Sequence, residues 1–206
     1  MRGEPTATKG TTIVGIVCKG GTVLAADTRA TLGSMVTSER VTKVFQVDDH
    51  LAVAGAGLVG DVLGLVKVLR AEARLYRAKV GREMSVKALA TLLSNILNEG
   101  RGYAYFAWFL VGGYDSKPAL YSIDAAGGLT EERYVAAGSG MEFALAVLEE
   151  NFSEGMGLDD AVKLAARALK AAIKRDVFTG GRITLVTITE DGYHEMKGEE
   201  VEALLQ

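Results

Sequence analysis

Hydrophobic and polar positions follow two different periods along this chain, and the changes of period mark its structural elements. Short runs rich in β-branched residues, bounded by glycine and aspartate, are typical of strands. The segments that show this pattern span residues 13–18, 22–27, 43–47, 51–56, 105–113, 119–124, 132–137, 183–189 and 193–195. Residues 29–39 are polar, and we expect them to be irregular, with a turn at Gly33.

Helical periodicity occurs in two pairs of segments and once more at the end of the chain. Apolar residues recur at spacings of three and four from residue 61 to near Gly81. A second helix is expected between an N-cap at Ser85 and residues 98–100. The later helices are expected over residues 142–151, 158–175 and 199–205.

The order of these elements predicts the fold class. Clustered strands and paired helices do not fit a doubly wound parallel sheet, in which strands and helices alternate. They predict an α+β fold, a four-layer α/β/β/α sandwich of two stacked antiparallel sheets flanked by helix pairs. The 206 residues are enough for one well-packed domain, and no linker or internal repeat divides them.

The charge and the first ten residues limit the classes of function. The net charge is −3 and no run of five basic residues occurs, which argues against a nucleic-acid partner. Residues 1–10 are polar and lack the apolar core of a secretory signal. No stretch approaches the roughly 18 consecutive apolar residues of a membrane span. We therefore expect a soluble, cytoplasmic protein with no membrane partner.

Cysteine and histidine are rare in this chain. Cys18 is the single cysteine, cannot form an internal disulfide, and is interpreted as a small buried residue. His50 and His194 are too few and too far apart in sequence to indicate a zinc site. No metal or organic cofactor is expected.

Candidate chemistry begins at residues 9–16, Lys-Gly-Thr-Thr-Ile-Val-Gly-Ile. The threonines could simply suit the pleated surface of a first strand. Alternatively, cleavage between Gly10 and Thr11 would give a terminal threonine with a hydroxyl nucleophile and a free amine. Such an amine has a pKa of about 7.7–8.0 and can act as a base near neutral pH. Gly10, which lacks a Cβ, would let the backbone fold tightly at the cut.

A terminal threonine nucleophile needs an acid–base relay, a cation and an oxyanion hole. Asp27 and Lys43 lie in the strands next to the candidate terminus, and a buried lysine there would favour the deprotonated nucleophile. Backbone amides of residues 55–57, before the first helix, could hold an oxyanion. Each feature also has a plain structural interpretation: a hairpin-end aspartate, an exposed strand lysine and a strand-to-helix turn. Residues 138–140 and 176–181 are similar turn signals.

Taken together, these segments resemble the β-type subunits of the archaeal 20S proteasome, threonine proteases of the N-terminal nucleophile hydrolase superfamily. The resemblance runs in order through nearly the whole chain. The segments that carry it are residues 10–15, 25–29, 43–47, 56–61, 90–95, 122–128, 138–140 and 174–176.

The resemblance implies a role for each site residue. Thr11 would be the nucleophile exposed by self-cleavage after Gly10, so that residues 1–10 form a propeptide and residues 11–206 the catalytic domain. Its implied partners are Asp27 and Lys43 in the site, the Gly57 amide as oxyanion donor, the hydrogen-bonding pair Ser139 and Asp176 around the threonine amine, and the structural residue Arg29. Ile13 stands where many relatives carry a third threonine. Thr179 stands where a serine is usual and keeps the hydroxyl.

The resemblance also implies a specificity pocket and partners. The pocket residues are small or apolar, namely Ala30, Val41, Gly55, Val59 and Leu63, with Gly55 leaving the base open. Filling of this pocket predicts cleavage after bulky hydrophobic residues. The implied partners are other β subunits in a heptameric ring, α-type subunit rings, an ATPase regulatory particle and unfolded polypeptide substrates.

Two alternatives to a proteolytic subunit are left open by the sequence. One is a β-type subunit that stays unprocessed and serves as an inactive structural member of the ring. The other is a different N-terminal nucleophile hydrolase, such as the simpler bacterial ATP-dependent peptidase or a small-molecule amidase. Co-assembly with α-type subunits would argue against the second alternative, and persistence of residues 1–10 in an assembled particle would favour the first.

Overall fold

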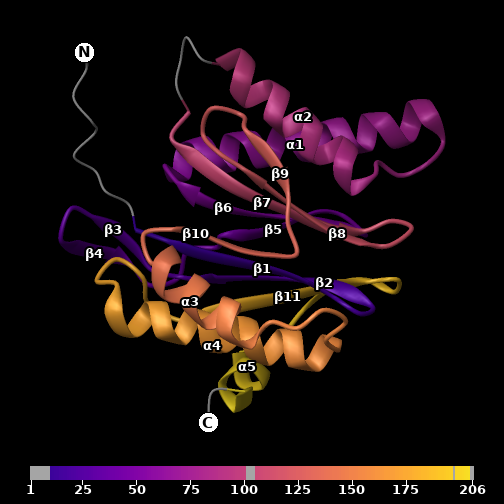
Figure 1. Ribbon diagram of the computed structural model, residues 1–206. Helices are drawn as coiled ribbons and strands as arrows, with labels where there is room; N and C mark the ends of the chain where they lie inside the picture. The colour runs from indigo at the N-terminus through magenta and orange to yellow at the C-terminus, as the bar shows by residue number, and fades with distance from the viewer. Residues whose placement is uncertain (1–9, 101–104, 197, 205–206) are drawn as a thin grey trace.

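Two antiparallel five-stranded sheets stack at the centre of the computed structural model, which describes residues 10–100, 105–196 and 198–204 (Figure 1). The first sheet has the order β10 (Tyr134–Gly138), β1 (Thr12–Cys18), β2 (Gly21–Asp27), β11 (Ile183–Thr189) and β12 (Gly192–Glu195). The second has the order β5 (Val44–Asp48), β6 (Leu51–Gly57), β7 (Ala107–Tyr114), β8 (Pro118–Ile123) and β9 (Leu129–Glu131).

Helices cover the outer face of each sheet. On the second sheet lie α1 (Val59–Val80) and α2 (Val86–Glu99), and on the first lie α3 (Met141–Asn151), α4 (Leu158–Arg175) and the short α5 (Gly198–Leu204) (Figure 1). The Ser85 hydroxyl accepts a hydrogen bond from the Ala88 amide at 3.2 Å, which confirms the predicted N-cap of α2. The predicted four-layer sandwich is confirmed.

Three hydrophobic clusters separate the layers, one between the sheets and one beneath each helix pair. Strand alternation in β1 explains the division, because successive side chains point to opposite faces. Ile13 packs between the sheets, whereas Val14 and Ile16 pack with α4. The same alternation separates the side chains of Thr11 and Thr12.

The two sheets approach each other closely. A Cβ placed on Gly15 would lie 2.7 Å from Leu120 Cδ1, which is too close for an unshifted side chain. The buried Thr22 hydroxyl donates a hydrogen bond of 2.9 Å from the first sheet to the Gly113 carbonyl of the second. Small residues and a cross-sheet hydrogen bond therefore set the spacing of the sandwich.

Three sequence-based predictions about the strands were wrong. Residues 29–39 are not irregular, because β3 (Ala30–Leu32) and β4 (Met35–Ser38) form a hairpin whose turn includes Gly33 at φ 57°. Strand β9 was missed. The strand pairs expected over residues 13–27 and 43–56, whose pattern predicts that the chain opens as one antiparallel sheet, lie in different sheets. The hairpin and β9 are short and mostly exposed, so they lack the apolar alternation of a strand that covers a core. Residues 1–9 of the predicted propeptide and residue 205 of the last helix lie outside the described residues.

Candidate active site

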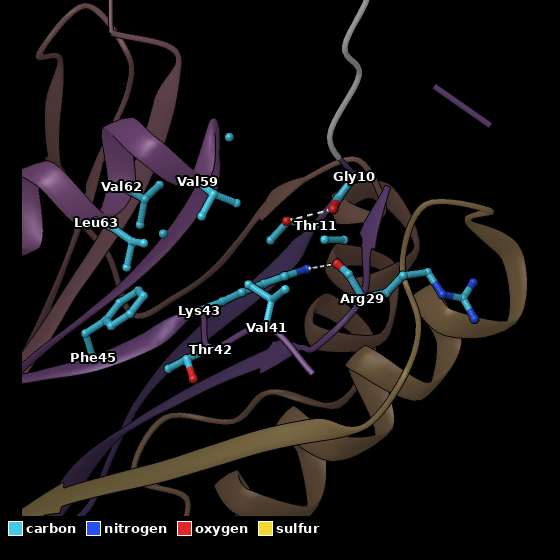
Figure 2. A pocket seen from close by; sticks show the side chains of 13 residues that line it. Gly10, Thr11, Arg29, Val41, Thr42, Lys43, Phe45, Val59, Val62 and Leu63 are labelled. Atoms are coloured by element: carbon cyan, nitrogen blue, oxygen red, sulfur yellow. Dashed lines mark hydrogen bonds between the residues drawn. The ribbon is translucent and has the colours of Figure 1, made fainter. Parts of the chain in front are cut away.

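Thr11 lies directly before β1, with 5% of its surface exposed. Its hydroxyl donates a hydrogen bond of 2.8 Å to the Gly10 carbonyl oxygen (Figure 2). Its backbone N–H donates to Ser139 Oγ at 3.2 Å. The candidate nucleophile is therefore held next to the carbonyl of the bond that the sequence predicts to be cut.

Lys43 and Asp27 form a buried ion pair beside Thr11. Lys43 Nζ donates to Asp27 Oδ1 at 2.8 Å and to the Arg29 carbonyl at 2.6 Å (Figure 2). Their side chains are 6% and 0% exposed, respectively. The interpretation of Lys43 as an exposed strand lysine does not hold, because Lys43 and Asp27, which does end strand β2, are buried against each other.

Burial and charge act in opposite directions on Lys43. Removal from water lowers its pKa below the ordinary value of 10.5, because burial disfavours the charged form. The Asp27 carboxylate opposes this effect and favours the ammonium ion. The charge of Lys43 therefore depends on its partner Asp27.

A second hydrogen-bond network joins β1 to the segment after α4. Ser139 Oγ and Thr179 Oγ1 each donate to Asp176 Oδ2 at 2.5 Å. Since Thr179 uses its proton there, it accepts from Thr12 Oγ1 at 2.7 Å, and Thr12 Oγ1 in turn accepts from the Gly140 amide at 3.1 Å. Thr12, which sequence reasoning had not assigned, therefore connects α3 to the carboxylate that orients Ser139.

Gly57 lines the same pocket as Thr11. The Gly55 amide donates to the Lys43 carbonyl at 2.9 Å, while the Leu58 amide donates at 2.8 Å to the carbonyl of Phe106, directly before β7. Amides alternate sides along a strand, so the Gly57 N–H points away from β7 and past the start of β5. A side chain at Gly57 would overlap the Phe106 carbonyl, and its φ of 129° also favours glycine.

A small, mostly apolar pocket opens beside Thr11. All five predicted pocket residues line it, namely Ala30, Val41, Gly55, Val59 and Leu63. Phe45 and Val62 also line it and were missed, although Phe45 lies two residues after Lys43 and so shares its strand face. Figure 2 shows Val59, Val62 and Leu63 projecting from α1 toward the pocket.

Arg29 and Cys18 lie outside the reacting groups. The Arg29 side chain points away from the pocket, donates to the Val177 carbonyl at 3.3 Å and pairs with Glu39 (Figure 2). Burial raises the pKa of the Cys18 thiol to about 11, so it is not a nucleophile at neutral pH.

None of the helices in the described ranges is long and apolar enough to cross a membrane.

Comparison with known proteins places this chain in a family. The profile of the proteasome subunit family matches residues 7–188. A "Proteasome subunit beta 1" of Thermococcus kodakarensis is 74% identical over 198 residues, which cover 96% of this chain and 98% of the relative. That of Thermococcus gammatolerans is 73% identical over 197 residues, with the same coverage. A "Proteasome subunit beta 2" of Pyrococcus furiosus is 59% identical over 198 residues, or 96% of each chain.

The four-layer sandwich, with a threonine at the start of its first strand, is the fold expected of an N-terminal nucleophile hydrolase. Within that class, the chain belongs to the proteasome subunit family, and the relatives named above are its archaeal β-type members.

Proposed function

We propose that this chain is a proteolytic β subunit of the 20S proteasome core, which hydrolyses peptide bonds of unfolded proteins through an acyl-enzyme on Thr11. The observation that carries this proposal is the convergence of Thr11, a buried Lys43–Asp27 pair and the Ser139–Asp176 pair beside one apolar pocket. The threonine-type endopeptidase activity implied by the resemblance fits these groups.

The first event is self-cleavage after Gly10, which gives Thr11 a free amine. In the mature chain, that amine accepts the proton of the Thr11 hydroxyl while the oxygen attacks the substrate carbonyl carbon. The Gly57 amide stabilises the resulting oxyanion. The C–N bond then breaks, the leaving nitrogen takes the proton, and water hydrolyses the ester on Thr11.

The charged partners set the protonation of these groups. Lys43 acts as the ammonium ion, which favours the alkoxide of Thr11 and disfavours charging of the nearby amine. Ser139, held by Asp176, orients the nitrogen of Thr11, because it already accepts that N–H at 3.2 Å. Thr179 supports Asp176 from the other side.

The pocket supports cleavage after bulky hydrophobic residues. Its lining residues are small or apolar apart from Thr11, Arg29, Thr42 and Lys43, and the charge of Lys43 is paired with Asp27. The base is less open at Gly55 than the sequence predicts, because a Cβ there would lie 2.6 Å from Val62 Cγ1. The partners proposed are a heptameric β ring, α-type rings and an ATPase regulatory particle, in the cytoplasm.

The test compares Thr11→Ala and Thr11→Ser in particles assembled with α-type subunits. We expect Thr11→Ala to assemble, to keep residues 1–10 and to lose hydrolysis of peptide reporters, whereas Thr11→Ser keeps measurable activity. The unmodified particle should hydrolyse reporters ending in leucine or tyrosine at least about tenfold faster than acidic ones. Activity in Thr11→Ala would refute the nucleophile. An unprocessed, inactive unmodified particle would identify a structural ring member instead.

A further inference from the structure

Gly10 is held on three sides in the unprocessed chain. Gly10 is buried, its N–H donates to Thr31 Oγ1 at 3.2 Å, and its carbonyl accepts from Thr11 Oγ1 at 2.8 Å. A Cβ on Gly10 would overlap Phe178 Cβ and would lie 2.8 Å from Phe178 Cγ. The α-carbon of Gly10 therefore lies flat against Phe178, which leaves no room for a side chain.

Phe178 is itself fixed by the site. Its backbone N–H donates to Asp176 Oδ1 at 3.2 Å, while Asp176 Oδ2 accepts from Ser139. Ser139 Oγ is also the acceptor of the Thr11 N–H. One carboxylate thus holds both the wall against Gly10 and the serine on the nitrogen of the Gly10–Thr11 bond.

We propose that Phe178 and Thr31 form a cradle that positions the Gly10 carbonyl for self-cleavage. This inference rests on the proposed function, in which the chain cuts its own Gly10–Thr11 bond. Both are positioning residues, because neither side chain takes part in a bond change. The cradle also explains why glycine precedes the nucleophile: Phe178 occupies the space of a side chain at position 10.

The step that the cradle serves balances without any added group. Thr11 Oγ attacks the Gly10 carbonyl carbon, and the hydroxyl proton passes to the Thr11 nitrogen. The C–N bond breaks, which leaves an ester between Gly10 and Thr11 Oγ and a free amine on Thr11. Water then hydrolyses the ester, which releases the Gly10 carboxylate and restores the hydroxyl.

The experiment follows loss of residues 1–10 by intact mass after assembly with α-type subunits. We expect Gly10→Ala to slow processing by about a hundredfold or more, because misplacement of reacting atoms by about 1 Å has effects of that size. Adding Phe178→Gly to the Gly10→Ala variant should raise its processing rate at least about tenfold. Recovery is partial, because the Phe178 α-carbon would remain 2.7 Å from the new methyl group.

A matched control separates removal of the wall from added backbone freedom. Val177→Gly combined with Gly10→Ala changes the neighbouring residue, whose side chain is 77% exposed, and should restore nothing. At the other contact, Thr31→Val removes the hydrogen bond to the Gly10 N–H and should slow processing by about three- to tenfold, while Thr31→Ser keeps the rate. For Thr31→Val, the loss of processing rate should exceed any loss of peptidase rate per processed subunit.

The cradle is overturned if Phe178→Gly gives no recovery in an assembled Gly10→Ala particle, or if Val177→Gly gives as much. It is also overturned if Thr31→Val processes at the unmodified rate, a test that does not depend on Phe178→Gly folding. Thr11→Ala distinguishes failure of the proposed self-cleavage from failure of the proposed cradle. Loss of residues 1–10 in that variant would refute self-cleavage itself, whereas its retention together with a failed recovery refutes the cradle alone.

Discussion

Four hydrogen-bond donors converge on the Asp27 carboxylate at the residue scale. Oδ1 accepts from the Thr12 amide at 2.9 Å and from Lys43 Nζ, while Oδ2 accepts from the Arg29 and Gly180 amides at 3.0 and 2.9 Å. An ionised carboxylate can only accept hydrogen bonds, so the four donors match the two oxygen atoms of Asp27. An asparagine would turn an NH₂ group toward donors, and the pair with Lys43 would be broken. Asp27→Asn should lower the unfolding free energy by about 3–5 kcal/mol.

The pH dependence of peptide hydrolysis tests the charge of Lys43. A rate that needs the ammonium ion falls as the pH rises through the lysine pKa, so the alkaline limb of kcat/KM should lie below pH 10.5. Since Asp27 raises this pKa against burial, Asp27→Asn should move the limb to still lower pH. The measurement is kcat/KM for a leucine reporter from neutral pH to about half a unit above that lysine value, with particle integrity followed by native mass.

As the pH rises, Lys43 affects stability in the opposite direction to activity. Between its lowered pKa and 10.5, the unfolded chain binds more protons at this lysine than the folded chain, so this group makes stability rise with pH. Loss of activity in that window is therefore not unfolding caused by Lys43. Asp191→Asn, at an exposed turn, is the control and should leave the limb unchanged. An unchanged limb in Asp27→Asn would contradict a charged Lys43 in the rate-determining step.

At the scale of single elements, one glycine inside α1 and the glycine that ends it differ in whether their backbone conformation tolerates a side chain. Gly64 is exposed inside the helix, where an added methyl group would meet open space, whereas Gly81 ends the helix in the left-handed conformation at φ 75°. Gly64→Ala should raise the unfolding free energy of the unassembled subunit by about 0.5–1 kcal/mol. Gly81→Ala should lower it by about 1–2 kcal/mol, because a Cβ is disfavoured there.

Denaturant unfolding of the two variants measures this difference, and each serves as the control for the other. The same change of residue adds one methyl group to the same helix in both cases. A destabilised Gly64→Ala subunit would show that the outer face of α1 is packed rather than free before assembly.

Elements were predictable where one face covers a core. Helix α4 and strand β11 match their predicted ranges to the residue, because their apolar periodicity faces a buried cluster. The hairpin of β3 and β4 was not predictable, since most of its side chains face solvent. The candidate site depended on the family resemblance for its roles, because Lys43 and Asp27 are 16 residues apart and only the fold joins them. Contacts such as Phe178 against Gly10 follow from loop geometry that carries no periodic signal.

At the scale of the whole molecule, the two sheets contribute opposite sides of the site. Thr11 leads into β1 of the first sheet, and Gly57 ends β6 of the second. The distance between the proposed nucleophile and the proposed oxyanion donor therefore depends on how closely the sheets pack. Gly15, in the middle of β1, permits this packing against Leu120 and Leu110.

Gly15→Val should separate the sheets and so affect catalysis as well as stability. Overpacking of this kind lowers the unfolding free energy by about 1–3 kcal/mol. A shift of about 1 Å between reacting groups can lower the rate by about a hundredfold, so kcat per processed subunit should fall at least about tenfold. Ile16→Val is the matched control, because Ile16 faces α4 rather than the other sheet. It should cost about 0.5–1.5 kcal/mol of stability and keep kcat. If Gly15→Val also keeps kcat, the spacing of the sheets does not set the geometry of the reacting groups.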